Sequence, residues 1–354
     1  MAAGSSMQEQ RSRPPSERGG IVVLDFGGQY TQLIARRIRE QQVFSAVLPC
    51  NSSLEKIKEF EPAGVVLSGG PSSVYDPQAP KCDAQVLAAG IPVLGICYGM
   101  QWITHTLGGK VENAGRQEYG RASLDRSCGS AKPESELFAG VAQSLRIWNS
   151  HGDHVHTLPE GFCATAKTAN AIAALESAGR KIYAVQFHPE VKHTESGTQI
   201  LRNFLFRICK AEPKWSGAAF IEETTQAIKD KVGNKWAICA LSGGVDSTVA
   251  AVLVHRALGD KLTNIFVDTG MLRKNEFADT LEMLRDRLHL KVIGVDASDR
   301  FLDKLKGVSD PEQKRKIIGG EFIAVFAEEA QNFKKAKPTA KSVTSFRERS
   351  IRMS

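Results

Sequence analysis

The chain has 354 residues, of which 42% are hydrophobic and 24% charged, which excludes a disordered chain and a disulfide-rich miniprotein and suffices for two domains. Its formal net charge is +7, but residues 334–354 carry seven Lys or Arg and one Glu, so the rest is nearly neutral and no dedicated nucleic-acid partner is expected. No run reaches the roughly 18 apolar residues of a membrane-spanning helix, and the N-terminus lacks the apolar centre of a signal peptide, so we expect a cytosolic protein without a membrane partner.

The first domain is expected to span residues 20–210, because residues 1–19 are rich in Ser, Arg, Gln and Pro and predict a disordered leader. From there, apolar runs that end in Gly or Pro alternate with amphipathic stretches. The predicted strands are IVVLD, VFSAVLP, AGVVLS and IPVLGIC, and the predicted helices are TQLIARRIREQ, CDAQVLAAG and YGMQWITHTLGG. This alternation predicts a parallel sheet with helices on both faces, which is a doubly wound α/β domain.

Between residues 116 and 191 the helical period fades, and we expect antiparallel strands that extend the same sheet. The candidates are SLRIWNS, FCATAKT, AIAALES and KIYAVQF, and the helix GTQILRNFLFRIC closes the domain. The Pro- and Gly-containing segment KAEPKWSG then predicts a domain boundary.

A second α/β domain is expected over residues 217–333, where a helix, AAFIEETTQAIKDKVG, precedes renewed alternation. The predicted strands are WAICAL, LTNIFVD and LKVIGVD, and the predicted helices are residues 246–258, EFADTLEMLRDRLH and KRKIIGGEFIAVFAEEAQ. Residues 334–354 have no apolar periodicity and predict a divergent basic tail.

A cysteine lies on a predicted sharp turn between a strand and a helix. Cys97 stands in GICYGMQ, directly after the apolar run that ends at Leu94. Glycines permit such a turn, and the N-terminus of the helix that follows favours the anionic form of a thiol. The alternative is a buried core cysteine, which is the usual fate of this residue. The turn therefore predicts a nucleophile only if a base lies nearby.

A histidine that could be this base follows the strand-like KIYAVQF. Pro189 favours an extended conformation for His188, and residues two apart in an extended chain point to the same face. His188 and Glu190 could therefore be a base and the carboxylate that orients it, with Cys97 as nucleophile.

These two elements resemble the class I, or triad, glutamine amidotransferases over residues 21–209. The resemblance implies a flavodoxin-like domain in which Cys97 attacks the carboxamide of glutamine, His188 transfers the proton and ammonia is released. Ser68-Gly69-Gly70-Pro71 matches the oxyanion loop of the family, which assigns the backbone N–H groups of Gly70 and Tyr98 to the tetrahedral intermediate. Further positions match residues that bind glutamine in the family; they are Gln101, Ser150, His151 and Gly152.

A glycine-rich loop follows a strand in the second domain and opens a helix. Its sequence is neither GxxxxGK[ST] nor GxGxxG, but backbone amides in such a turn, together with Ser and Thr hydroxyls, bind phosphate. The alternative is a tight turn that serves only helix–strand packing. The residues are Ser242, Gly243, Gly244, Val245, Asp246, Ser247 and Thr248.

SGGVDS resembles the pyrophosphate loop of the ATP pyrophosphatases, which have an adenine-nucleotide α-hydrolase-like fold and cleave ATP between the α and β phosphates. Asp268 ends the strand NIFVD, at the sheet edge where α/β proteins bind ligands, and is predicted to join the ATP site. Asp246 is a candidate ligand of Mg²⁺, since this ion takes one or two carboxylates plus phosphate oxygens. Asp296, which ends VIGVD, could be a ligand residue or a helix N-cap.

The combination of the two domains, with VDTGMLRKNE and DPEQKRKIIGGEFI in the second, resembles the glutamine-hydrolysing GMP synthetases. The resemblance implies three substrates, glutamine, xanthosine 5′-monophosphate (XMP) and ATP, and the products GMP, AMP and pyrophosphate. Arg315 would contact the XMP phosphate, although it could instead lie on a solvated helix face. After Gln331 the chain departs from the family pattern, so we expect it to be truncated, with an incomplete ATP pyrophosphatase domain. The family forms homodimers through a C-terminal region that is expected to be absent here. Two alternatives stay open: a glutaminase without ligase activity, and a regulatory protein that binds nucleotide without turnover.

Overall fold

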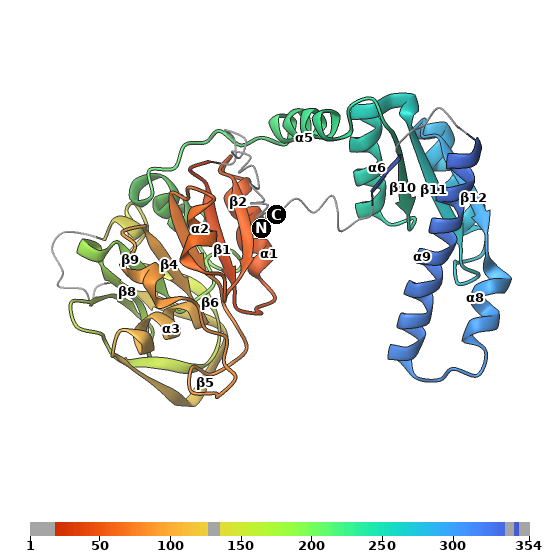
Figure 1. Ribbon diagram of the computed structural model, residues 1–354. Helices are drawn as coiled ribbons and strands as arrows, with labels where there is room; N and C mark the ends of the chain where they lie inside the picture. The colour runs from red at the N-terminus through yellow and green to blue at the C-terminus, as the bar shows by residue number, and fades with distance from the viewer. Residues whose placement is uncertain (1–17, 127–134, 337–342, 347–354) are drawn as a thin grey trace, which may run out of the picture. The chain divides into compact units, whose positions relative to one another are not determined.

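A computed structural model describes residues 18–126, 135–336 and 343–346. The chain forms two compact units that divide after Gly217 (Figure 1). Each unit is an α/β layer structure built around its own sheet.

The first unit contains a nine-stranded sheet with the order β2-β1-β3-β4-β9-β8-β7-β5-β6. The first five strands in this order are parallel to their neighbours, and the remaining pairs are antiparallel. The strands are β1 (Ile21–Asp25), β2 (Ser45–Pro49), β3 (Gly64–Leu67), β4 (Val93–Ile96), β5 (Lys110–Asp125), β6 (Ser144–Thr157), β7 (Cys163–Lys167), β8 (Ile172–Ser177) and β9 (Ile182–Val185).

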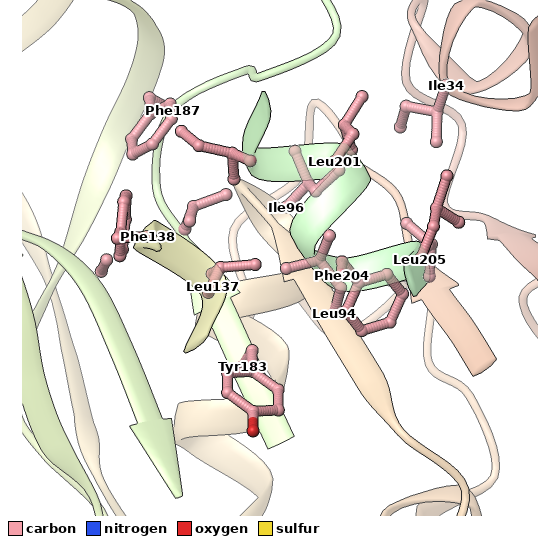
Figure 2. Close-up of a cluster of buried hydrophobic side chains, with 14 of the residues drawn as sticks. Ile34, Leu94, Ile96, Leu137, Phe138, Tyr183, Phe187, Leu201, Phe204 and Leu205 are labelled. Carbon is pink, nitrogen blue, oxygen red and sulfur yellow. The ribbon is translucent and has the colours of Figure 1, made fainter. Parts of the chain in front are cut away.

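Helices cover both faces of this sheet, which confirms the predicted doubly wound α/β fold. They are α1 (Thr31–Arg39), α2 (Leu54–Lys58), η2 (Ala84–Ala88), α3 (Tyr98–Thr106), η3 (Glu136–Phe138), η4 (Ala178–Arg180), α4 (Gly197–Arg202) and η5 (Asn203–Ile208). Successive residues of a strand point to opposite faces, so Val23 belongs to one hydrophobic cluster and Leu24 to another. Figure 2 shows the cluster of Val23, in which Phe204 and Leu205 from η5 pack near Leu94 of β4. Apolar residues on both faces explain why the parallel strands have continuous apolar sequences.

The predicted antiparallel extension of the sheet is present, but strand β5, which pairs with β6, was not among the predicted strands. The sequence of β5 alternates weakly and has few β-branched residues, so it gives no clear strand signal. Its extended conformation is stabilised by pairing with β6 from Lys110 to Asp125, interrupted by two register shifts. Pairing of this kind between distant segments is a tertiary interaction that a local pattern does not contain.

The second unit has a four-stranded parallel sheet with the order β12-β11-β10-β13. Its strands are β10 (Trp236–Leu241), β11 (Leu262–Asp268), β12 (Val292–Asp296) and β13 (Val343–Phe346). Its helices are α5 (Gly217–Val232), α6 (Val245–Leu258), η6 (Gly259–Lys261), α7 (Glu276–Glu282), η7 (Met283–Arg287), α8 (Ser298–Leu305) and α9 (Pro311–Ala336). Two hydrophobic clusters, one containing Leu241 and the other Ile238, use alternate residues of β10.

Two elements of this unit were absent from the sequence prediction. Helix α8 is short, and only Phe301 of it is buried. Strand β13 lies within the segment that was expected to be an unstructured tail, and it pairs in parallel with β10. Within the described residues, no helix is both long and apolar enough to cross a membrane.

Candidate active site

Cys97 lies on a sharp turn between β4 and α3. Its φ of 53° and ψ of −107° lie in a region that L-residues rarely adopt, and strained backbone of this kind concentrates at functional sites. The close approach of the turn to the sheet requires glycine, because a Cβ on Gly99 would come within 2.4 Å of the carbonyl oxygen of Leu67. The strand–turn–helix geometry predicted from GICYG is therefore present, with the side chain of Cys97 4% exposed.

His188 and Glu190 follow β9 and are held together as the HPE sequence suggests. The Nδ1 atom of His188 lies 2.7 Å from Oε1 of Glu190, and both residues are at least 95% buried. Thr194 fixes this segment from below, because its hydroxyl donates to the carbonyl oxygen of His188 at 2.6 Å and accepts from the backbone N–H of Trp148 at 3.2 Å. Glu190 thus orients the imidazole, and Thr194 holds the backbone that carries it.

The environment of His188 favours its protonated form. Burial of the ring lowers its pKa, but hydrogen bonds with Cys97 and Glu190 and the charge of Glu190 outweigh burial and raise the pKa from 6.5 to about 10. A positive ring beside a cysteine is the arrangement that activates sulfur nucleophiles in proteins. The three predicted residues of the triad therefore form one contiguous group in the structure.

A cavity of about 500 Å³ opens above this group. Cys97, His188, Gly70, Gln101 and Gly152 all contribute to its lining. The Nε2 atom of Gln101 donates to the backbone carbonyl of Asp153 at 2.8 Å, which ties α3 to strand β6.

The two predicted oxyanion donors, the backbone N–H groups of Gly70 and Tyr98, belong to residues near Cys97 and the cavity. Gly70 lines the cavity, and Tyr98 is the first residue of α3, so its backbone N–H has no acceptor within the helix. Ser150 and His151 belong to β6, but their side chains lie outside the described residues.

Sequence reasoning missed the loop after β1 and one residue of α1. Gly28 and Tyr30 line the cavity, and the rings of Tyr30 and His188 make a T-shaped contact, with the centroids 5.1 Å apart. From α1, the Nε atom of Arg37 donates to the backbone carbonyl of Glu190 at 2.9 Å. The Gly27-Gly28 pair after a strand is the only sequence signal for this loop, and it is too common to identify a site.

The glycine-rich loop of the second unit joins β10 to α6. Gly243 has a φ of 79°, and the helix begins directly after Gly244. Hydroxyl groups brace the turn, because Ser247 donates to the carbonyl oxygen of Gly244 at 3.0 Å and lies 3.0 Å from the hydroxyl of Ser242. Thr248 donates to the same carbonyl at 2.9 Å. The N-terminus of α6 and the loop amides form an arrangement suited to bind phosphate.

The three acidic residues proposed from the sequence as ligand-binding candidates lie at the ends of different elements of this unit. Asp246 is exposed in the first turn of α6, and Asp268 at the end of β11 accepts a hydrogen bond from the N–H of Gly270 at 2.8 Å. Asp296 accepts from both the N–H and the hydroxyl of Ser298, the first residue of α8, but the N-cap position of this helix is Ala297. Arg315 is exposed on α9, in an ion pair with Glu312 at 2.8 Å.

The donors present fit a magnesium ion that is held mainly by a phosphate substrate. The described residues contain no group of three or more His, Cys, Asp or Glu that could hold a metal by themselves. A single exposed carboxylate beside the glycine-rich loop, Asp246, matches the usual contribution of proteins to Mg²⁺–nucleotide binding.

Comparison with known proteins agrees with this geometry. Residues 22–208 match the family model described as glutamine amidotransferase class-I, and the chain therefore belongs to this family. Residues 220–320 match the family model described as NAD synthase. The first unit thus belongs to the class-I glutamine amidotransferases, and it is followed by a domain similar to NAD synthase.

Over both units the chain is similar to proteins named GMP synthase [glutamine-hydrolyzing]. It is 54% identical to the one from Acetivibrio thermocellus over 312 residues and 52% identical to the one from Bacillus subtilis over 315 residues. These matches cover 88% and 89% of this chain, which spans about 60% of the length of each relative. Among solved structures, the chain is similar to a glutamine amidotransferase from Thermotoga maritima, with 20% sequence identity and a TM-score of 0.42. The match covers 55% of this chain and 100% of the Thermotoga maritima chain.

Proposed function

We propose that the first unit hydrolyses glutamine to glutamate and ammonia at Cys97, His188 and Glu190. The observation that carries this proposal is the imidazole of His188, which lies between the Cys97 sulfur and the Glu190 carboxylate at the base of the cavity. A charged imidazole beside a sulfur supplies both a thiolate and a proton for the leaving amine.

In the proposed reaction, the Cys97 thiolate attacks the side-chain carbonyl carbon of glutamine. The N–H groups of Gly70 and Tyr98 stabilise the oxyanion of the tetrahedral intermediate. His188 then gives its proton to the leaving nitrogen, the C–N bond breaks, and ammonia leaves a glutamyl thioester. A water molecule that loses its proton to His188 hydrolyses the thioester, which releases glutamate and regenerates the thiolate beside protonated His188.

Four residues are proposed to bind glutamine. Gln101 and Gly152 line the cavity beside Cys97, and this position supports their assignment. Ser150 and His151 precede Gly152 directly in β6, and family resemblance supports theirs.

We propose that the second unit uses ATP to activate XMP, so that the whole reaction is the glutamine-dependent amination of XMP to GMP. The glycine-rich loop, residues 242–248, would hold the ATP phosphates, with Asp268 at the adjacent strand end. ATP adenylates the C2 oxygen of XMP and releases pyrophosphate; ammonia then displaces AMP. Likeness to GMP synthases extends over both units, and this favours the ligase function over a glutaminase alone.

Two residues complete the proposed nucleotide site. Asp246 would hold Mg²⁺, which when bound offsets the negative charge of the ATP phosphates. Arg315 would contact the phosphate of XMP, and its side chain is accessible for this purpose, since it is 79% exposed. Cytosolic location belongs to the same proposal and rests on family resemblance.

The test compares two nitrogen sources in GMP formation from XMP, ATP and Mg²⁺. With glutamine, Cys97→Ala is expected to form no GMP; with ammonium chloride, it is expected to match the wild-type chain. Asp246→Asn is expected to lose activity with both nitrogen sources. If Cys97→Ala formed GMP from glutamine at the wild-type rate, the assignment of the nucleophile would be wrong.

A further inference from the structure

Gln186 lies beside the nucleophile of the first unit in a position that the strand register fixes. It follows the last residue of β9, and β9 pairs in parallel with β4 so that Val185 is opposite Ile96. The next residues along the two strands are Gln186 and Cys97, and the N–H of Cys97 donates to the carbonyl of Val185 at 2.8 Å. Neighbouring positions at the ends of parallel strands place both side chains at the same sheet edge.

The side-chain amide of Gln186 contacts the sulfur. Its Nε2 atom donates to Sγ of Cys97 at 3.8 Å, which is a hydrogen-bond distance for sulfur. The backbone N–H of Gln186 donates to the carbonyl of Ala173 at 2.9 Å, so β8 holds the residue in place. Gln186 is 1% exposed, and water therefore does not compete for the amide.

The other end of this amide is unsatisfied. The Oε1 atom of Gln186 is buried and has no hydrogen-bond partner among the described residues. A buried polar atom without a partner destabilises a protein by roughly 1–3 kcal/mol, whereas an apolar side chain of similar volume would avoid this penalty. A glutamine at this position is therefore poorly explained by packing, and its contact with the sulfur accounts for it.

We propose that Gln186 is a further catalytic residue, whose amide N–H stabilises the thiolate of Cys97 and fixes the direction of the sulfur toward the cavity. The inference rests on the proposed glutaminase chemistry. His188 must give up its proton to the leaving ammonia, so it cannot stabilise the sulfur throughout the reaction. A neutral amide has no proton to transfer and keeps its donor aimed at the sulfur when the thiolate is regenerated. Hydrogen bonds to charged groups are about twice as strong as neutral ones, so the contact matters most in the anionic state.

The test measures alkylation of Cys97 by iodoacetamide over a range of pH, with peptide mass spectrometry to identify the modified residue. Gln186→Met keeps the volume of the side chain and removes the donor. We expect its Cys97 to be alkylated about tenfold more slowly at pH 7, with the midpoint of the pH profile about one unit higher, since one unit corresponds to a factor of ten. Gln199→Met is the matched control, because Gln199 donates to Asn203 instead of the sulfur; it is expected to alkylate as the wild type does.

A second measurement needs no variant of Gln186. The side-chain amide resonance of Gln186 is measured by NMR in the wild-type chain and in Cys97→Ala, and it is expected to differ between the two. An amide resonance that stays unchanged, or equal alkylation profiles for Gln186→Met and wild type, would overturn the role of Gln186. A wild-type Cys97 no more reactive than Cys50 would instead contradict the proposed nucleophile, so the two failures are distinguishable.

Discussion

Replacement of Glu190 by Gln tests the electrostatic basis of the candidate site most directly. The carboxylate of Glu190 is 2.7 Å from the His188 ring, and together with Cys97 it raises the pKa of His188 to about 10 against the lowering effect of burial. Glu190→Gln keeps the volume and removes the charge. Burial then opposes Cys97 alone, and we expect the pKa of His188 in the variant to fall by roughly 1.5–2 units.

The size of this effect follows from the pKa shift. A rise from 6.5 to about 10 corresponds to about 5 kcal/mol at 1.36 kcal/mol per unit, and if the two partners contribute equally, Glu190 supplies roughly 2 kcal/mol. Because the pKa is raised in the folded state, this stabilisation is fully present below pH 6.5 and is lost as the pH rises through about 10. The difference in unfolding free energy between the wild type and Glu190→Gln should therefore be largest near pH 6 and shrink toward pH 10.

Two assays test the predicted effect of Glu190→Gln. NMR titration of the His188 ring carbons measures its pKa directly, and urea unfolding at pH 6 and pH 9 measures the free energies. Glu195→Gln is the control, since Glu195 is exposed and pairs with Arg146. Glutamate release by Glu190→Gln should fall by about 10²-fold or more, the usual range for loss of an oriented general acid–base. An unchanged His188 pKa in the variant would refute the reasoning.

Three further predictions concern packing, a buried carboxyl and the phosphate loop. Gly99→Ala should lower the unfolding free energy by about 1–3 kcal/mol, because its Cβ would clash with Leu67; Gly179→Ala, where a Cβ meets nothing, should leave urea unfolding unchanged. Burial raises the pKa of Glu176, so ionisation of this carboxyl destabilises the folded state as the pH rises above 4.5. Glu176→Gln should therefore have a higher melting temperature than the wild type at pH 7, and the difference should vanish at pH 4. Gly243→Ala places a side chain at a φ of 79° and should weaken ATP binding in calorimetry by about tenfold, since strain of this kind amounts to roughly 1–2 kcal/mol.

Local sequence was sufficient for much of the fold and for the turns that carry the site. Residues close in sequence decide a sharp strand-to-helix turn, so GICYG and SGGVDS each indicated their structures. Buried parallel strands bear apolar residues on both faces, which made the strands of both sheets recognisable. The His188–Glu190 contact also followed from local geometry, because extended residues two apart share a face.

Tertiary structure decided what depends on strand order and pairing. Strand β5 has no clear pattern of its own and becomes extended through its partner β6. The contacts of Arg37 with Glu190, of Tyr30 with His188 and of Gln186 with the sulfur join segments that are distant in sequence. A single sequence contains the propensities of each segment, whereas the hydrogen-bonded register between strands determines which segment ends meet at one edge of the sheet.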